Sequence, residues 1–336
     1  MLFDLLREPP PRFRTALVAG TLKRLGGSAC DSRGRVYLNI GHTGLDGHGL
    51  LQWVDHTGVR PVYFVHDLIP LTHPEFCRGG EAERHCSRMR TALSTGIGVI
   101  GNSQATLDEL AVFAEEQQLP RPPAVAAWLG TSPAEYAPIS PPERPTFVVL
   151  GTIEGRKNHL LLLRIWSRLV AKLGDDAPRL LVIGQRGWEA DDVFRILDED
   201  RALRGHVIEL NHCSDEETAQ HLSSARALLF PSEAEGYGLP LVEALGLGVP
   251  VIASDLPVFR EIGQGVPLLL DAADEASWEK AIVEFSQSTS AARDEQLRRL
   301  SGFRAPTWDD HFRIVEEWLA TIDSVRGDRG SIRSAS

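Results

Sequence analysis

The stretch FPSEAEGYGLPLVEALGLGVPVIAS, residues 230–254, decides the fold. It opens at the end of an apolar run, passes through a loop with two glycines, continues as a short apolar helix and ends in a second apolar run. Pro240 stands at the predicted first position of that helix, where a missing N–H is tolerated. The order strand, loop, helix, strand is typical of a parallel sheet, whose ligands bind beyond the carboxyl ends of the strands.

Two glutamates of this stretch are candidates for binding a nucleotide-sugar. Glu235 lies in the loop, and Glu243 follows within the helix, so both can face the same edge of the sheet. Their carboxylates would accept hydrogen bonds from sugar or ribose hydroxyls. Gly236 and Gly238 let the backbone approach a ligand closely, and the free amides of the helix N-terminus favour a diphosphate. The alternative is a pair of solvated glutamates without a ligand.

The rest of the chain repeats the alternation of strand and helix in two halves. In the second half we expect strands at 146–152, 179–184, 206–210, 225–232 and 249–254, and helices at 158–174, 193–200 with its flanks, 215–224 and 240–248. In the first half we expect strands at 35–40, 61–67 and 96–103, and helices at 81–94 and 104–118. This alternation predicts an α/β protein with two Rossmann-like, doubly wound parallel-sheet domains.

The boundary between the halves is the proline-rich segment PISPPERP, 138–145, which cannot continue a helix or a central strand. The predicted domains are an N-terminal domain (1–142) and a C-terminal nucleotide-sugar-binding domain (143–305). A last helix, 306–324, and a disordered tail, 325–336, complete the chain.

A second candidate group follows the first strand of the C-terminal half, in GTIEGRKNH, 151–159. Gly151 ends the strand, and Arg156 and Lys157 precede a helix. Adjacent cations at a strand-to-helix turn suit a diphosphate, whose charge they would neutralise as it leaves. The alternative is an ordinary basic pair on the surface.

A third group lies in the N-terminal half, where His66 and Asp67 end a strand in VHDLIPLTHPEF, 65–76. His66 could donate to a sugar hydroxyl; alternatively it is a core histidine, with Asp67 capping the next segment. Ser103, before the helix at 104–118, is most simply an N-cap, and a polar contact to substrate is the lesser alternative.

Composition narrows the class of protein. The 336 residues carry a formal net charge of −11, which argues against bulk binding of nucleic acid. We find no apolar run long enough to span a membrane and no apolar stretch of a secretory signal near the start. Dinucleotide, P-loop and nucleophile-elbow motifs are absent, as is an Asp-x-Asp pair that would bind a metal. We therefore expect no cofactor and no metal.

At these motifs the chain resembles glycosyltransferase family 4, over about 35–320. GTIEGRKNH and FVHDLIPLTHPEF look most like bacterial mannosyltransferases of capsular or exopolysaccharide assembly. The resemblance implies a GT-B fold, in which two Rossmann-like domains face each other across a cleft and the last helix crosses back to the first domain. It also implies a retaining, metal-independent hexosyltransferase that moves mannose from GDP-mannose to a polysaccharide or lipid-linked acceptor.

The resemblance assigns roles to individual residues. Glu235, Lys157, Arg156 and His66 would act at the reacting centre, through the donor sugar and its diphosphate. Glu243 would bind the ribose. The remaining substrate contacts would come from Gly151, Gly236, Tyr237, Gly238, Leu239, Asp67 and Ser103. The leaving phosphate oxygen would help to deprotonate the acceptor hydroxyl, so no general base is assigned. The protein would work in the cytoplasm, with peripheral contact to the inner face of the membrane.

Two departures from the family keep other functions open. Thr152 stands where many members have arginine, a variant that the mannosyltransferase-like members share. The N-terminal half is short, and GTLKRLGGSAC, 20–30, has glycines but no strand before it. A non-catalytic nucleotide-sugar-binding partner subunit with a degenerate acceptor domain is therefore one alternative. A GT-B sugar-nucleotide epimerase is another.

Overall fold

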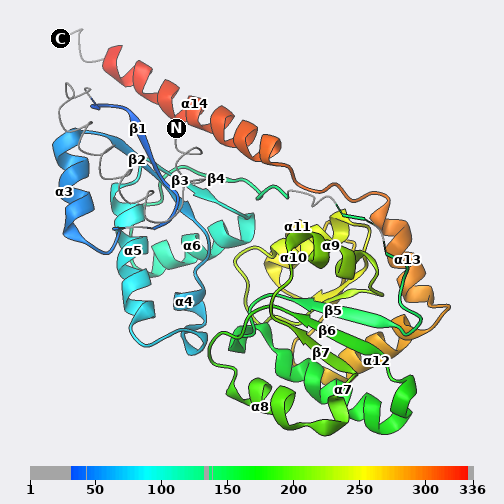
Figure 1. Cartoon of the computed structure of the whole chain (residues 1–336). Helices are drawn as coiled ribbons and strands as arrows, with labels where there is room; N and C mark the ends of the chain where they lie inside the picture. Colours follow the sequence, from blue (N-terminus) through cyan, green and yellow to red (C-terminus); the bar gives the residue numbers. More distant parts are fainter. Residues whose placement is uncertain (1–31, 43, 132–135, 138, 332–336) are drawn as a thin grey trace, which may run out of the picture.

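The computed structural model describes residues 32–42, 44–131, 136–137 and 139–331 (Figure 1). The segment GTLKRLGGSAC, 20–30, lies outside these residues. Within them the chain forms two parallel sheets, each with helices packed against it. We call the first sheet and its helices, with the last helix of the chain, the first domain, and the second sheet with its helices the second domain.

The sheet of the first domain has the strand order β1-β2-β3-β4, and every neighbouring pair is parallel. Val62 of β2 is level with Gly98 of β3, and this register places the ends of β2 and β3 side by side. The strands are β1 Val36–Asn39, β2 Arg60–Val65, β3 Gly98–Gly101 and β4 Ala124–Ala126. The helices between them are α3 His48–Thr57, α4 Ile69–Thr72, α5 Glu81–Thr95 and α6 Gln104–Glu116.

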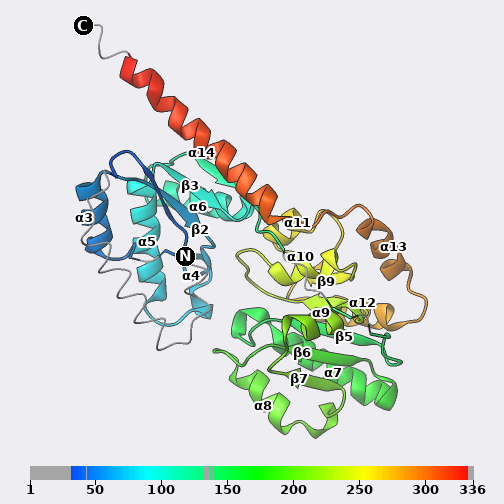
Figure 2. The same ribbon diagram turned by 45° about the horizontal axis from the view of Figure 1, so that its top comes forward.

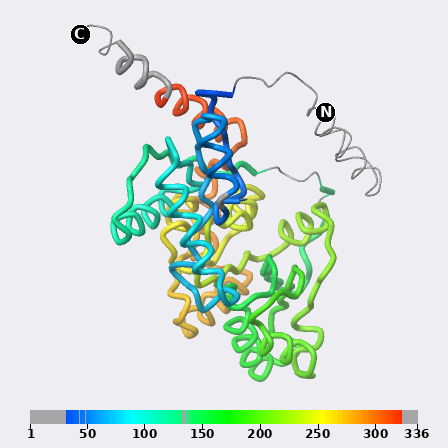
Figure 3. Tube along the Cα trace, turned by 90° about the vertical axis from the view of Figure 1, so that its left-hand side faces the viewer, coloured from blue at the N-terminus to red at the C-terminus, as the bar shows by residue number. Residues whose placement is uncertain are grey.

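The two faces of this sheet are covered by different parts of the chain. Met89 of α5 and Leu110 of α6 pack with Val65 and Val99 on one face. On the other face Val315 of α14 (Trp308–Ser331) packs with strand residues of β2 and β3. Figures 1 and 2 both show α14 along this sheet, and in the side view of Figure 3 its red trace returns to the blue and cyan first domain. The end of the chain therefore completes the core of the first domain.

The sheet of the second domain has the order β10-β9-β8-β5-β6-β7, and all its neighbouring strands are parallel. Read from β7, this is the dinucleotide-binding order 3-2-1-4-5-6 of a doubly wound sheet. The strands are β5 Thr146–Leu150, β6 Arg179–Ile183, β7 Val207–Leu210, β8 Leu228–Phe230, β9 Val251–Ser254 and β10 Leu268–Leu270.

Side chains that alternate along these strands pack into two hydrophobic cores, one on each face of the sheet. Phe147 and Val149 pack with Trp166 of α7 and Trp278 of α12, whereas Val148 packs with Leu241 of α10 on the opposite face. In Figure 1 helices α7, α8 and α12 lie on one side of the sheet and α9, α10 and α11 on the other. The helices are α7 His159–Leu173, α8 Asp191–Glu199, α9 Asp215–Ser223, α10 Leu239–Gly246, α11 Pro257–Ile262, α12 Glu275–Ser286 and α13 Ala291–Leu300.

The two segments that connect the domains run against each other. The amide of Thr131 donates to the carbonyl of Pro306 (3.0 Å). A Cβ on Gly130 would lie 2.2 Å from the amide nitrogen of Trp308, so only glycine allows this approach. In the part of the chain that the structure describes, the outgoing and the returning segments therefore meet where they pass between the domains.

The predicted fold class is confirmed, but several elements differ. The helices α3, α4 and α11 to α13 and the strands β4 and β10 were not predicted from the sequence. The last helix was expected to end at 324, whereas α14 runs to Ser331 because no proline interrupts it. The sequence showed no clear first strand followed by a glycine-rich loop on the acceptor side. In the structure β1, within the strand expected at 35–40, is followed by a loop with Gly41, Gly44 and Gly47 before α3.

Candidate functional site

The predicted residues of the second domain gather where β5 and β8 lie side by side. The helix that follows β5 covers one face of the sheet and the helix that follows β8 covers the other, so this is the topological switch point at which open α/β sheets bind ligands. The loop after β5 carries Gly151, Arg156 and Lys157, and the loop after β8 carries Glu235 to Gly238. The topology thus brings together two motifs that are 78 residues apart in sequence.

A buried ion-pair cluster joins the two loops. Lys157 Nζ lies 2.5 Å from Glu235 Oε1, and Arg156 Nη1 lies 2.9 Å from Glu235 Oε2. Arg156 Nη2 also contacts Glu154 Oε1 at 2.7 Å. The side chain of Glu235 is 7% exposed and that of Lys157 11%. Two cations and two carboxylates are therefore held in fixed positions, with little water among them.

The charges of the cluster set its protonation states. Burial alone would raise the pKa of Glu235, but Lys157 and Arg156 outweigh burial and lower it. Burial opposes the charge of Arg156, but Glu235 and Glu154 raise its pKa. Glu235 is therefore an ionised acceptor of hydrogen bonds and not an acid, and Arg156 stays cationic.

Backbone geometry places the amine of Lys157 over the start of the loop. Gly151 has φ 137°, and a Cβ built on it would lie 3.7 Å from Lys157 Nζ. The amine also lies 5.1 Å from the centre of the Phe230 ring, the last residue of β8. Positive φ at Gly151 is the conformation that glycine alone adopts readily, so this turn explains why glycine stands there.

Glu243 lies apart from this cluster, within α10. Its carboxylate is half-buried and has no hydrogen-bond or ion-pair partner among the described residues. Burial raises its pKa, and the nearby charge of Asp215 at the start of α9 raises it further. Two carboxylates that lack donors are well suited to the paired hydroxyls of a ribose. Asp215 was not singled out in the sequence, where it looks like an ordinary first-turn acid.

The loop after β8 touches the predicted residues of the first domain. A Cβ on Gly236 would lie 2.7 Å from both Asp67 Cβ and the carbonyl oxygen of His66. His66 and Asp67 directly follow β2, so the third predicted motif meets the first. The candidate site therefore lies at the junction of the two domains.

The side chains of His66 and Asp67 are already engaged. His66 Nε2 lies 2.7 Å from the carbonyl oxygen of Ile40, so that nitrogen donates to the backbone, leaving Nδ1 to meet a ligand. Asp67 Oδ1 accepts from the amide of Ile69 (3.1 Å) at the start of α4. If His66 Nε2 were to donate to a sugar, its hydrogen bond to Ile40 would have to break. Asp67 caps the next segment, which was the alternative to a role in substrate binding.

Four other residues were predicted to contact the substrate, and at least two of them have structural roles. Ser103 is fully buried, and its Oγ accepts from the amide of Thr106 (3.1 Å) as the N-cap of α6. Tyr237 is buried, and its hydroxyl donates to the carbonyl of Leu129 (3.0 Å) in the first domain. Gly238, with φ 111°, precedes α10, whose first residue Leu239 remains exposed. The side chains of Ser103 and Tyr237 are therefore engaged within the protein and do not face a substrate.

Two histidines beside His66 were not predicted. The ring centroids of His42 and His66 are 5.5 Å apart, and those of His42 and His85 are 5.6 Å apart. Burial, with the charges of its two neighbours, lowers the pKa of His42 to about 4, so it is neutral at pH 7. Positive φ at His42 (54°) turns the chain after β1, a signal that the sequence does not display. Among the described residues no group of three or more His, Cys, Asp or Glu side chains is arranged to hold a metal ion.

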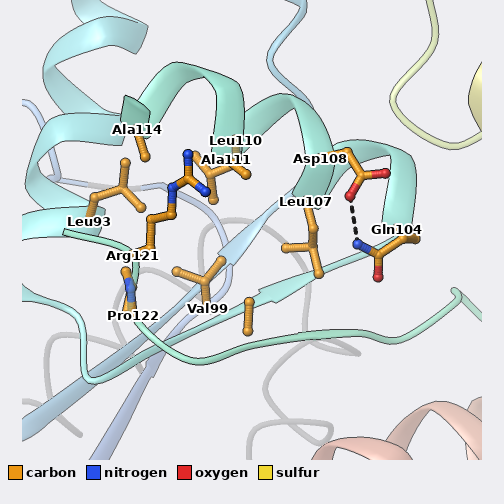
Figure 4. A pocket seen from close by; sticks show the side chains of 11 residues that line it. Leu93, Val99, Gln104, Leu107, Asp108, Leu110, Ala111, Ala114, Arg121 and Pro122 are labelled. Atoms are coloured by element: carbon orange, nitrogen blue, oxygen red, sulfur yellow. Dashed lines mark hydrogen bonds between the residues drawn. The ribbon is translucent and has the colours of Figure 1, made fainter. Parts of the chain in front are cut away.

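A separate cavity of about 260 Å³ lies between α6 and β4 (Figure 4). It is mostly apolar, and Arg121 reaches over it. None of the residues that we predicted for the site lines it. Its lining residues are Leu93, Val99, Gln104, Leu107, Asp108, Leu110, Ala111, Ala114, Arg121, Pro122 and Ala124.

Residues 136–298 match the family model Glycosyl transferases group 1. HepE of Anabaena, solved in complex with UDP, has a TM-score of 0.64 at 17% identity, and the match covers 86% of this chain and 79% of that one. The two parallel-sheet domains are thus those of the GT-B glycosyltransferases.

The proteins similar to this chain in sequence include bacterial mannosyltransferases. O-antigen chain mannosyltransferase B of Escherichia coli is 26% identical over 271 residues, which are 78% of this chain and 71% of that protein. The serotype-specific mannosyltransferase WbdA of Escherichia coli is 39% identical over 120 residues, 36% of this chain but only 14% of WbdA. This chain therefore has the GT-B fold and resembles bacterial mannosyltransferases over the stretches given, as the motifs predicted.

Proposed function

We propose that this protein is a retaining, metal-independent mannosyltransferase that transfers mannose from GDP-mannose to a saccharide or lipid-linked saccharide. The observation that carries the proposal is the Arg156–Lys157–Glu235 cluster at the β5/β8 switch point. It combines two fixed cations for a diphosphate with an ionised carboxylate for sugar hydroxyls, at the edge where α/β sheets bind nucleotides.

The cations would stabilise the leaving group. As the bond between the sugar C1 and the diphosphate oxygen breaks, negative charge gathers on that oxygen. Arg156 and Lys157 are held in advance by Glu235 and Glu154, so little reorganisation is needed to meet this charge. They would take the role that a metal ion has in other enzymes.

The carboxylates would orient the donor. Glu235 keeps lone pairs for sugar hydroxyls, while Glu243 and Asp215 would accept from the ribose. The acceptor hydroxyl would attack C1 on the face that the diphosphate leaves, and its proton would pass to the leaving phosphate oxygen. The configuration at C1 is then retained, and no side chain is required as the base.

The choice of mannose rests on the named relatives, which are mannosyltransferases. Guanine is the base that we propose; UDP, bound in HepE, is the natural competitor to test. A thermal-shift comparison of GDP-mannose with UDP-glucose would separate them, because a ligand that binds only the native state raises the melting temperature. A larger shift with UDP-glucose would contradict the proposed donor.

Transfer itself needs a second measurement. Purified protein with GDP-mannose and a mannose-terminated acceptor should release GDP and form a product whose α-linkage is detected by NMR. The rate of transfer should be unchanged when EDTA is added. Donor binding without transfer to a range of acceptors would instead indicate the non-catalytic partner subunit. Interconversion of the free nucleotide-sugar without acceptor would indicate an epimerase.

We also propose that the enzyme works at the cytoplasmic face of the membrane, where lipid-linked acceptors would be presented. None of the described helices is long and apolar enough to cross a bilayer. Flotation of the protein with liposomes tests the membrane contact, and failure to float with any anionic or neutral vesicle would contradict it.

A further inference from the structure

Glu261 of the second domain accepts hydrogen bonds from two backbone amides of the first domain and from the side chain of Trp128, which follows β4. Its Oε1 accepts from the amide of Gln104 (2.8 Å) and from Nε1 of Trp128 (2.6 Å). Its Oε2 accepts from the amide of Ala105 (2.9 Å). Hydrogen bonds to a carboxylate are roughly twice as strong as those between neutral groups. A single side chain of α11 therefore fastens one domain to the other.

The position of these donors explains the arrangement. Gln104 and Ala105 are the first two residues of α6, whose amides have no partner within the helix. Ser103, the N-cap, satisfies the amide of the third residue, Thr106. Glu261 supplies acceptors to the other two and places a negative charge at the positive end of the helix dipole. The N-terminus of α6 is thus capped from both domains.

The same turn of α6 contacts both halves of the candidate site. The hydroxyl of Thr106 lies 2.9 Å from Asn102 Oδ1 and 3.3 Å from the carbonyl oxygen of Gly236. Asn102 Nδ2 donates to the carbonyl of His66 (2.7 Å). An interaction that holds the first turn of α6 in place therefore also sets the position of the Glu235 loop relative to the end of β2.

We propose that Glu261 is a positioning residue for the transfer reaction: by capping α6 across the domain junction, it sets the distance between the donor-side loop and the strand end that carries His66. The kinetic part rests on the function proposed above, whereas the structural part does not. Glu261 touches no predicted substrate group, so its effect passes through α6, Asn102 and Thr106.

The test uses Glu261→Ala, Glu261→Gln and the matched control Arg260→Gln. Arg260, its neighbour on α11, forms an exposed ion pair with Asp255. A misplacement of about 1 Å can lower a rate on the order of 10²-fold. For both Glu261 variants we expect kcat to fall by about ten- to 100-fold, while KM for the donor changes less than about threefold, and no change for the control.

Small-angle scattering gives a readout that is independent of activity. Without its acceptor the junction should open more often, so Glu261→Ala should have a larger radius of gyration than the wild type and Arg260→Gln. Trp128→Phe removes one donor and keeps the two amide bonds, so its kcat and radius should be intermediate. This second variant tests the proposal even if Glu261→Ala folds poorly.

The outcomes separate the two proposals. A wild type without transferase activity, combined with opening of the Glu261 variants in scattering, would support the junction and reject the enzyme. A Glu261→Ala protein with the wild-type radius of gyration and the wild-type kcat would overturn the positioning role. A lower melting temperature with unchanged kcat and radius would also overturn it, since that is the signature of a merely structural residue.

Discussion

Lys157 and Glu235 form an ion pair of 2.5 Å between the loops after β5 and β8, although 78 residues separate them in sequence. Both side chains are largely buried, so the amine and the carboxylate hold each other where water cannot replace either. The pair keeps Lys157 aimed at the position proposed for a diphosphate. It also limits Glu235 to the role of an ionised acceptor.

Lys157→Ala should lower kcat at least about 10²-fold, because it removes a preformed charge from the leaving group. The exposed Lys172 at the end of α7 provides the control, and Lys172→Ala should behave as the wild type. The measurement is GDP release from GDP-mannose with a saturating acceptor. Turnover of Lys157→Ala at the wild-type rate would remove this residue from the proposed mechanism.

Glu243→Ala should weaken donor binding about tenfold, equivalent to roughly 1.4 kcal/mol, since the ribose hydroxyls lose an acceptor. Titration calorimetry with GDP-mannose and with GDP checks this. Both ligands should weaken equally, because both carry the ribose. Glu216→Ala, an exposed acid on α9, serves as the control. A loss confined to GDP-mannose would instead assign Glu243 to the sugar.

Gly236→Ala should impair catalysis without unfolding either domain. The new Cβ would meet Asp67 Cβ and the His66 carbonyl oxygen at 2.7 Å, so the loop and the strand end must separate. Displacement on the scale of 1 Å predicts a loss of kcat on the order of 10²-fold. Gly79→Ala has open space around it and is the matched substitution. Equal activity of the two variants would contradict the close contact at Gly236.

Stability should fall as the pH drops from about 6.5 towards 4, partly because of His159. Burial, together with Lys157, lowers its pKa to about 4, and neither ring nitrogen has a partner among the described residues. Below pH 6.5 the unfolded state binds a proton that the folded state does not, so the free energy of unfolding decreases with falling pH. At roughly 1.4 kcal/mol per pKa unit, the total effect is about 3 kcal/mol.

Urea denaturation at pH 7 and pH 4.5 measures this effect. His159→Leu should lose less stability between the two pH values than the wild type, because the leucine cannot be protonated in the unfolded state. His56→Gln, at an exposed position of α3, should follow the wild type. Equal losses for His159→Leu and the wild type would show that this histidine does not contribute.

The sequence predicted what is local in the fold. Apolar runs that end at Leu150 and Phe230, each followed by glycines and a helix, identify two strand-to-helix turns of a parallel sheet. The Rossmann order then makes their loops neighbours, so Lys157 and Glu235 could be assigned to one site before their contact was known. Short elements such as β4 and β10, with three residues each, leave too little periodicity for prediction.

Relationships between the domains could not be predicted in this way. Glu261 is one acid among many in the sequence, and its acceptor role exists only because the start of α6 lies against α11. Tyr237 was predicted to meet substrate on the basis of its motif, but its hydroxyl is used by Leu129 across the junction. The local sequence pattern does not show which distant backbone amides or carbonyls a side chain will bind by hydrogen bonds.

The crossing of the two connecting segments has a mechanical consequence. Because Thr131 is hydrogen-bonded to Pro306 and Gly130 lies against Trp308, the two connecting segments are held together where they pass between the domains. Such a tether resists sliding and lengthening but leaves rotation about itself comparatively free. Once the bonds of Glu261, Tyr237 and Thr106 across the junction are broken, the crossing would act as a pivot, and a rotation about it would change the gap between Gly236 and Asp67.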